Sequence, residues 1–191
     1  RQIQRKFIQS ADLVIGLGFD TIEVEYEAWV GNTPVLSIDI EDPDIAQSVN
    51  LVGTVTGNIT ASLEYFLKQP VEQNTWTEKE LSEHLREFNT ALRPPSQNFT
   101  PHRAIDIVRE ILPKNGIISY DVGAHTHQIA SQWKAHSPKT CHVTNGWSSM
   151  GIGLPGAIAA KIARPDLPVV CLIGDGCFQM TVGELATARR Q

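Results

Sequence analysis

The sequence contains little cysteine, no long apolar run and no cluster of positive charge. Its three cysteines are odd in number and include no CxxC pair, which favours reduced thiols, as in a cytoplasmic protein, over a disulfide framework. Its apolar stretches are far shorter than the roughly 20 residues that cross a bilayer. Residues 1–7 also lack the apolar core of a secretory signal. We therefore expect no membrane partner and a cytoplasmic location.

The charge pattern gives no sign of a nucleic-acid partner. The 191 residues carry 16 basic and 21 acidic side chains, a net charge of −5, and the two signs are interspersed. Domains that bind nucleic acid instead concentrate Lys and Arg on one face. The composition, 41% hydrophobic and 19% charged, is that of an ordinary globular protein with one large domain or two small ones. Because the sequence starts at Arg1 rather than Met, we expect a piece of a longer protein.

Apolar strand-like segments alternate with helical segments in two blocks, which predicts an α/β fold of parallel sheets with flanking helices. The first block has predicted strands at 11–18, 33–39 and 51–56 and helices at 1–9, 21–30 and 59–68. The second has strands at 116–121, 140–144 and 168–173 and helices that begin at Pro101 and span 124–133, 153–163 and 182–190. The polar residues 70–99 between them predict a linker with a helix at 78–89. Asn58 and Thr100 are predicted helix N-caps.

Three glycine-containing segments follow strands of the second block, at residues 121–125, 144–151 and 174–176. Any one of them alone is more often a structural turn than a ligand site. In a parallel sheet, however, the carboxyl ends of the strands share one edge, which is where ligands bind. The three segments together therefore favour a binding site.

Asp175 stands between Gly174 and Gly176, directly after an apolar strand and before a predicted helix. Its carboxylate can hold a hard cation, and the glycines allow backbone to approach a ligand closely. The N-terminus of a helix offers N–H groups to phosphate. This pattern predicts a metal-diphosphate site.

Residues 144–160, residues 173–180 and the pair Glu184-Leu185 resemble the thiamine diphosphate-dependent enzymes, most closely the acetolactate synthase large (catalytic) subunits. Residues 121–125 fit the same family, and residues 11–20 are similar to the later part of its central domain. The resemblance implies that residues 1–69 are the C-terminal part of a Rossmann-like central domain. Residues 100–191 would then be the truncated N-terminal part of the cofactor-binding domain.

The same resemblance implies roles for particular residues. Asp175 matches the magnesium ligand, and Gly123 and His125 match contacts to the diphosphate. Ser149 and Met150 match the segment at the aminopyrimidine ring, where Met150 props the cofactor in a bent form. The implied cofactor-binding set is Gly123, His125, Ser149, Met150, Gly174, Asp175, Gly176 and Cys177.

The implied activity is the decarboxylation of a 2-oxo acid such as pyruvate, followed by ligation to a second carbonyl compound. It implies thiamine diphosphate and Mg²⁺ as cofactors and a dimer or tetramer as the working unit. The family's second magnesium ligand, an Asn, and its activating Glu fall outside this sequence, so no catalytic residue is assigned within it. We therefore expect the 191-residue chain alone to bind cofactor weakly and not to turn over. Ala124 and the pair His127-Gln128 differ from relatives, which leaves the substrate open.

Other interpretations of the same residues stay open at this point. Gly16-Leu17-Gly18 with Asp39 imitates a dinucleotide fingerprint, which suggests a Rossmann-type nucleotide-binding module or an FAD site. Its third glycine is replaced by Thr21, which favours a structural turn.

His125 and His127 could suggest zinc, but their two-residue spacing on a helix puts them on different faces. Cys177 could be a nucleophile, although no base accompanies it in the sequence, and a small packing residue is the preferred interpretation. Trp147 could stack on the cofactor or be a buried aromatic residue.

Overall fold

The computed structural model describes residues 2–19, 28–70, 76–144 and 146–191. Contacts between residues divide the chain into two compact units, Arg1–Phe88 and Asn89–Gln191. The division falls inside helix α3 (Glu78–Leu92). This helix confirms the one predicted at 78–89 and extends it to Leu92. The predicted domain boundaries stay a prediction, and the predicted helix at 21–30 lies mostly outside the described residues.

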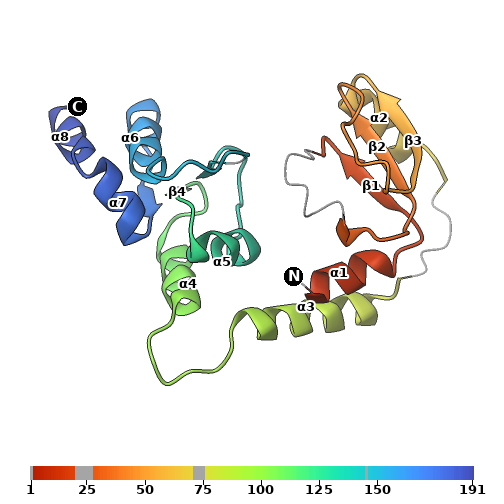
Figure 1. The fold of residues 1–191 in the computed structure, drawn as a ribbon, viewed down its shortest axis with the longest axis horizontal. Helices are drawn as coiled ribbons and strands as arrows, with labels where there is room; N and C mark the ends of the chain where they lie inside the picture. The colour runs from red at the N-terminus through yellow and green to blue at the C-terminus, as the bar shows by residue number, and fades with distance from the viewer. Residues whose placement is uncertain (1, 20–27, 71–75, 145) are drawn as a thin grey trace. The chain divides into compact units, whose positions relative to one another are not determined.

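The first unit contains a parallel sheet in the order β1-β2-β3 (Figure 1). Its strands are β1 (Val14–Leu17), β2 (Val35–Asp39) and β3 (Leu51–Thr56), as the apolar runs predict. The central strand β2 is the most buried of the three, because it pairs on both sides. Helix α2 (Ile59–Leu67) contacts β2 and begins at Asn58, whose side chain accepts the Ala61 N–H at 3.0 Å. That hydrogen bond confirms the predicted N-cap.

Helix α1 (Gln2–Gln9) joins α3 through aromatic rings within the first unit. The Phe7 ring stacks on the His84 ring with a centroid separation of 3.8 Å, and the Trp76 ring lies 4.5 Å from Phe7 at a tilt. These contacts bury apolar ring surface of α1. Helix α1 confirms the helix predicted at residues 1–9, as far as those residues are described.

The second unit contains a parallel sheet in the order β5-β4-β6, which confirms the predicted α/β class. Its strands are β4 (Ile117–Tyr120), β5 (Cys141–Val143) and β6 (Val169–Leu172). Its helices are α4 (Pro101–Ile111), α5 (Ala124–Gln132), α6 (Gly153–Ala163), α7 (Asp175–Thr181) and α8 (Glu184–Arg190).

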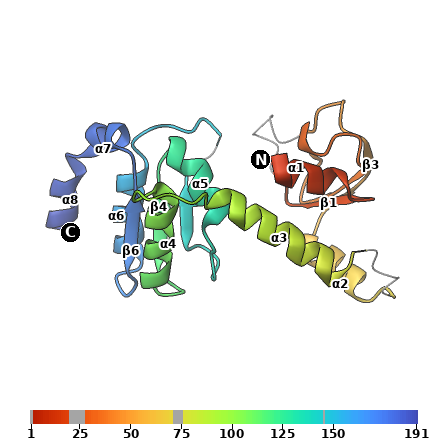
Figure 2. The same ribbon diagram turned by 90° about the horizontal axis from the view of Figure 1, so that it is seen from below.

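Strand β4 is buried on both faces, since helices cover each side of the sheet. Ile118 and Tyr120 pack with Ile105 of α4 and Ile129 of α5 in the core of this unit. On the opposite face, Ser119 donates a hydrogen bond to the Gly153 carbonyl of α6 at 2.9 Å. Figure 2 shows α6 and α5 on opposite sides of β4. This three-layer arrangement leaves the carboxyl ends of the strands as the open edge of the sheet.

Two sequence predictions about helix ends need correction. Thr100 has the extended backbone of an N-cap and precedes Pro101, but its hydroxyl does not cap the helix; it contacts His102 Nε2 at 3.0 Å. The single helix predicted at 182–190 is preceded by α7, which starts at Asp175 itself. The two glycines argue against a helix on propensity, yet the buried Cys177 side chain provides the packing that propensity lacks.

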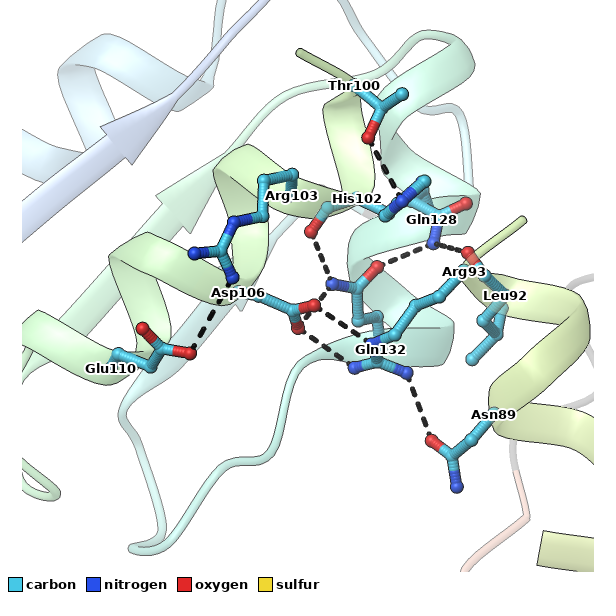
Figure 3. Close-up of polar contacts among 10 residues, drawn as sticks. All are labelled: Asn89, Leu92, Arg93, Thr100, His102, Arg103, Asp106, Glu110, Gln128 and Gln132. Carbon is cyan, nitrogen blue, oxygen red and sulfur yellow. Dashed lines mark hydrogen bonds and ion pairs between the residues drawn. The ribbon is translucent and has the colours of Figure 1, made fainter. Parts of the chain in front are cut away.

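A network of polar side chains fastens the end of α3 to α4 and α5 within the second unit (Figure 3). Arg93, just beyond α3, pairs with Asp106 of α4, and Gln132 of α5 donates to the same carboxylate at 2.6 Å. Gln128 donates to the Leu92 carbonyl at 3.2 Å. The network positions α4 and α5, which in turn pack on β4 beneath the open edge.

No helix among the described residues is long and apolar enough to cross a membrane.

Candidate active site at the strand ends

The three predicted segments do meet at the carboxyl edge of the β5-β4-β6 sheet. His125, in the first turn of α5, has its ring beside Gly174: a Cβ placed on Gly174 would lie 3.6 Å from the ring carbon Cε1. Met150 has its methyl group beside Gly176, 3.5 Å from where a Cβ would be. The structure thus brings residues of the β4, β5 and β6 segments together, and Ser149 lies exposed next to Met150. Asn145, in the same segment, lies outside the described residues.

Backbone conformations in these segments depend on glycine. Gly123 has φ +142° and Gly151 has φ +89°, a region that side-chain-bearing residues rarely adopt. Gly123 also has the His125 ring 3.1 Å from its Cβ position, so a side chain there would displace the histidine. The two glycines therefore allow the loops to approach one another and the space above the sheet.

Asp175 occupies the first turn of α7 and its side chain is exposed to solvent. The first N–H with an acceptor inside the helix belongs to Phe178, which donates to the Gly174 carbonyl at 2.9 Å. The preceding N–H groups, of Asp175, Gly176 and Cys177, therefore point out of the helix start. An exposed carboxylate beside these donors is suited to a cation with an anionic partner.

His125 supplies a second donor to the same place. Its Nε2 atom is buried and has no hydrogen-bond partner among the described residues. A buried polar atom without a partner is costly, and in natural proteins it commonly marks a functional group. Because the ring lies beside Gly174, a phosphate oxygen above the start of α7 would satisfy this nitrogen.

The donor set fits magnesium bound through phosphate. No group of three or more His, Cys, Asp or Glu side chains that could hold a metal exists in the described part of the chain. Magnesium is typically held by one or two carboxylates with water and substrate phosphates rather than by a protein cage. One carboxylate, Asp175, next to phosphate donors matches that pattern, whereas the arrangement offers nothing like a zinc site.

Cys177 is a packing residue in this structure. Its side chain is only 2% exposed, and its thiol donates to the Val122 carbonyl at 3.4 Å. Burial raises the pKa of the Cys177 thiol, and the neighbouring carboxylates of Asp121 and Asp175 raise it further. The thiol is therefore protonated at neutral pH, which argues against a nucleophilic role.

Asp121 is the residue of this site that the sequence analysis did not single out. It directly follows β4, is 1% exposed, and accepts the N–H groups of Val122 at 2.8 Å and Gly153 at 2.7 Å. Burial acts to raise its pKa, but these hydrogen bonds outweigh burial and hold the pKa below its ordinary value. An acidic residue directly after a fully buried strand was the available signal.

Two alternatives from the sequence change in the structure. Trp147 is 98% exposed, so the interpretation as a buried aromatic residue is wrong. In the first unit, Gly18 ends β1 with φ +56° and donates to the Ile38 carbonyl at 2.9 Å, which is a turn within the sheet. Residues 20–27, where a dinucleotide fingerprint would continue into a helix, lie outside the described residues.

Comparison with known proteins assigns this region. Residues 121–191 match the family described as thiamine pyrophosphate enzyme, C-terminal TPP binding domain, thiamine pyrophosphate being another name for thiamine diphosphate. This part of the chain is similar to the thiamine pyrophosphate enzymes. The match begins at Asp121 and includes all three strand-end segments, so the family assignment covers the whole edge described above.

Curated relatives extend the similarity over nearly the whole chain. Acetolactate synthase 3, chloroplastic, from Brassica napus is 31% identical across 95% of this chain, which covers 29% of that protein. The acetolactate synthase large subunit of Lactococcus lactis is 31% identical across 92% of this chain and 32% of its own length. A probable acetolactate synthase large subunit of Methanococcus aeolicus is 28% identical across 94% of this chain and 34% of its own length. The chain thus spans about a third of the length of these relatives, and the resemblance seen in the sequence is confirmed.

Proposed function

We propose that the protein binds thiamine diphosphate with Mg²⁺ and takes part in decarboxylating a 2-oxo acid such as pyruvate and joining the product to a second carbonyl compound. The observation that carries the proposal is the buried, unpartnered Nε2 of His125, whose ring lies beside Gly174, the residue before Asp175. The names of the relatives, all acetolactate synthases, support the choice of reaction.

The chain's own residues would divide the work of holding the cofactor. Asp175 would bind Mg²⁺ through its carboxylate, while His125 and the first N–H groups of α7 would donate to the diphosphate. Met150 would present an apolar side chain to the organic part of the cofactor from beside Gly176. When bound, thiamine diphosphate supplies the carbanion chemistry that decarboxylation needs, and the protein supplies orientation.

Turnover would require more than the described residues provide. The resemblance assigns no catalytic residue to this sequence, because the family's activating Glu has no match in it. We therefore propose that catalysis takes place in a homodimer or homotetramer whose remaining residues complete the site. Analytical ultracentrifugation of the protein measures that oligomeric state.

The direct test is cofactor binding measured through tryptophan fluorescence. We expect thiamine diphosphate to quench emission much more strongly when Mg²⁺ is present, because Asp175 would hold the diphosphate through the metal. Asp175→Ala should weaken binding by at least the roughly 10–100-fold that outer partners of a metal site contribute. The exposed Asp166→Ala serves as the charge-matched control and should bind as the unchanged protein does. Equal affinity of the Asp175→Ala protein would show that the metal assignment is wrong.

Reaction type is tested separately by carbon dioxide release from pyruvate. We expect the 191-residue chain alone to show no steady-state turnover even when it binds cofactor. Sustained release from this chain would contradict that part of the proposal without affecting the binding part.

A nucleotide-binding module is the competing function, and the same fluorescence assay separates it. A response to FAD or NAD without Mg²⁺, or a yellow purified protein, would favour the turn at Gly18 as a nucleotide site. We expect neither response from a fold whose second unit carries the site described above.

A further inference from the structure

Asp121 occupies the point where all three strand-end segments touch. It follows the central strand β4 and is 1% exposed. Around it lie the start of α6, the turn at Gly151 and the first turn of α7, which belong to segments that follow β5 and β6. A single buried carboxylate is thus shared by segments far apart in the sequence.

The carboxylate is held by backbone donors from the residue after it and from the start of α6. It accepts the Gly153 N–H at 2.7 Å and the Val122 N–H at 2.8 Å. The Cys177 thiol donates to the carbonyl of the adjacent Val122 at 3.4 Å, so the first turn of α7 is tied to the same end of β4. Among the described residues Asp121 forms no ion pair, so backbone N–H donors offset the cost of burying its charge.

The backbone of Gly153 is fixed on both sides of its Cα atom. Asp121 accepts its N–H, and the Ser119 hydroxyl donates to its carbonyl at 2.9 Å. A Cβ on Gly153 would lie 2.5 Å from Ile173 Cγ2 and 3.0 Å from Asp121 Cβ. Ile173, directly after β6, therefore packs closely against the Gly153 backbone. The start of α6, the end of β4 and the end of β6 therefore cannot move independently.

The neighbours of Asp121 are the residues proposed to hold the cofactor. Val122 precedes Gly123 and His125, and Gly151 follows Met150. Cys177 follows Asp175 by two positions in α7. Thr126 Oγ1 donates to the Asp121 carbonyl at 2.6 Å, which ties the first turn of α5 to the same residue.

We infer that Asp121 is the positioning residue of the cofactor site: its buried carboxylate locks the His125, Met150 and Asp175 segments into one arrangement. Asp121 contacts no cofactor itself and acts through Gly153 and Val122, whose carbonyl accepts the Cys177 thiol of α7. This inference rests on the proposed function, since it concerns the affinity for thiamine diphosphate with Mg²⁺.

The test replaces the carboxylate with an amide of the same shape. Asp121→Asn keeps one acceptor oxygen but turns an N–H₂ group toward donors, so at least one hydrogen bond is lost. We expect the dissociation constant for thiamine diphosphate with Mg²⁺ to rise about 10-fold, as for loss of an outer partner of a metal site. The matched control, Asp166→Asn, changes an exposed carboxylate in the same unit and should leave affinity unchanged. Affinities are measured well below the unfolding midpoint of every variant, where a residue that only stabilises the fold would not alter them.

Amide hydrogen exchange in the absence of ligand reports on the lock itself. In Asp121→Asn we expect faster exchange at residues 122–126, 150–154 and 175–178, with residues 105–111 unchanged. A uniform increase, or none, would overturn the inference.

Cys177→Ala provides the second variant if Asp121→Asn does not fold. It removes the thiol donor to the Val122 carbonyl, next to Asp121, while keeping the Cys177 backbone N–H. We expect a smaller loss of affinity, about 3-fold, with faster exchange at 122–126. Unchanged affinity and exchange in this variant would overturn the inference. If the unchanged protein does not bind thiamine diphosphate at all, the proposed function fails, whereas the exchange pattern still decides whether Asp121 locks the three segments.

Discussion

Arg93 donates two parallel hydrogen bonds to Asp106, from Nε and from one terminal nitrogen, each 2.9 Å long. Both side chains are about three-quarters buried, with 31% and 24% of their surface exposed. The pair at Arg164 and Asp166 has nearly the same geometry but is 56% and 60% exposed. The chain therefore contains two similar ion pairs that differ mainly in burial.

We expect Arg93→Lys to lower the free energy of unfolding by about 1 kcal/mol, because lysine keeps the charge but loses the two-pronged geometry. Arg164→Lys, its matched control, should change stability by less than about 0.5 kcal/mol, since exposed pairs contribute little. Urea unfolding of the two variants measures both values. Equal effects would mean that burial does not strengthen the Arg93 pair.

The same pair makes stability depend on acid. The hydrogen bonds from Arg93 lower the pKa of Asp106, so its contribution is complete above the ordinary carboxyl pKa of 3.8 and is lost as pH falls through the lowered value. We expect Asp106→Asn to be less stable at neutral pH and to lose less stability on acidification than the unchanged protein. Urea midpoints between pH 6 and pH 3 test the prediction, and parallel curves for the two proteins would contradict it.

Glycine at position 153 is required by space rather than by backbone angle. Gly153→Ala would place a methyl group 2.5 Å from Ile173 Cγ2, and we expect a loss of about 1–3 kcal/mol from overpacking. Gly183→Ala is the control, because nothing lies within 4 Å of its Cβ position and its φ of −58° suits alanine. That variant should be neutral or gain up to about 1 kcal/mol. Thermal unfolding compares the two, and a stable Gly153→Ala protein would mean that α6 can shift away from β6.

Substitution of His125 should affect cofactor binding without affecting the stability of the fold. A buried nitrogen without a partner contributes no hydrogen bond to the fold, so His125→Leu should leave the unfolding free energy within about 1 kcal/mol of the original. The same substitution removes a donor to the diphosphate, and we expect affinity for thiamine diphosphate with Mg²⁺ to fall about 10-fold. His127→Leu, on the exposed side of α5, is the control for affinity. A large loss of stability with unchanged affinity would make His125 a structural residue.

Most secondary structure followed from local signals in the sequence. Strand β3 and helix α6 have the predicted bounds, since apolar β-branched runs and small-residue helices need little help from distant contacts. Helix α7 was not predicted, because Gly174 and Gly176 are typical of a loop. Its helical conformation is favoured by the contact of Cys177 with Val122, which follows β4. The low helix propensity of these glycines is outweighed by a tertiary contact between residues 55 positions apart in the sequence.

The candidate site shows the same division. Asp175 and His125 were recognisable because their motifs place polar residues beside glycines at strand ends. Asp121 was not, since its role depends on the Gly153 N–H, whose position next to β4 is a product of sheet order. The exposure of Trp147 could not be predicted from the sequence either, because a tryptophan can be buried or can face solvent.

The order of strands in the second unit also affects how the chain must fold during synthesis. Strand β4 lies in the middle of the sheet, yet Ile118 pairs with Cys141 and with Val170, which are translated 23 (141 minus 118) and 52 (170 minus 118) residues later. Until β6 leaves the ribosome, one edge of the most apolar strand of the unit has no neighbour to pair with. Such long-range pairing slows folding and prolongs exposure of an aggregation-prone segment. The central position of β4, which buries Asp121 in the finished protein, makes the nascent chain dependent on completing nearly all of this unit before its core can close.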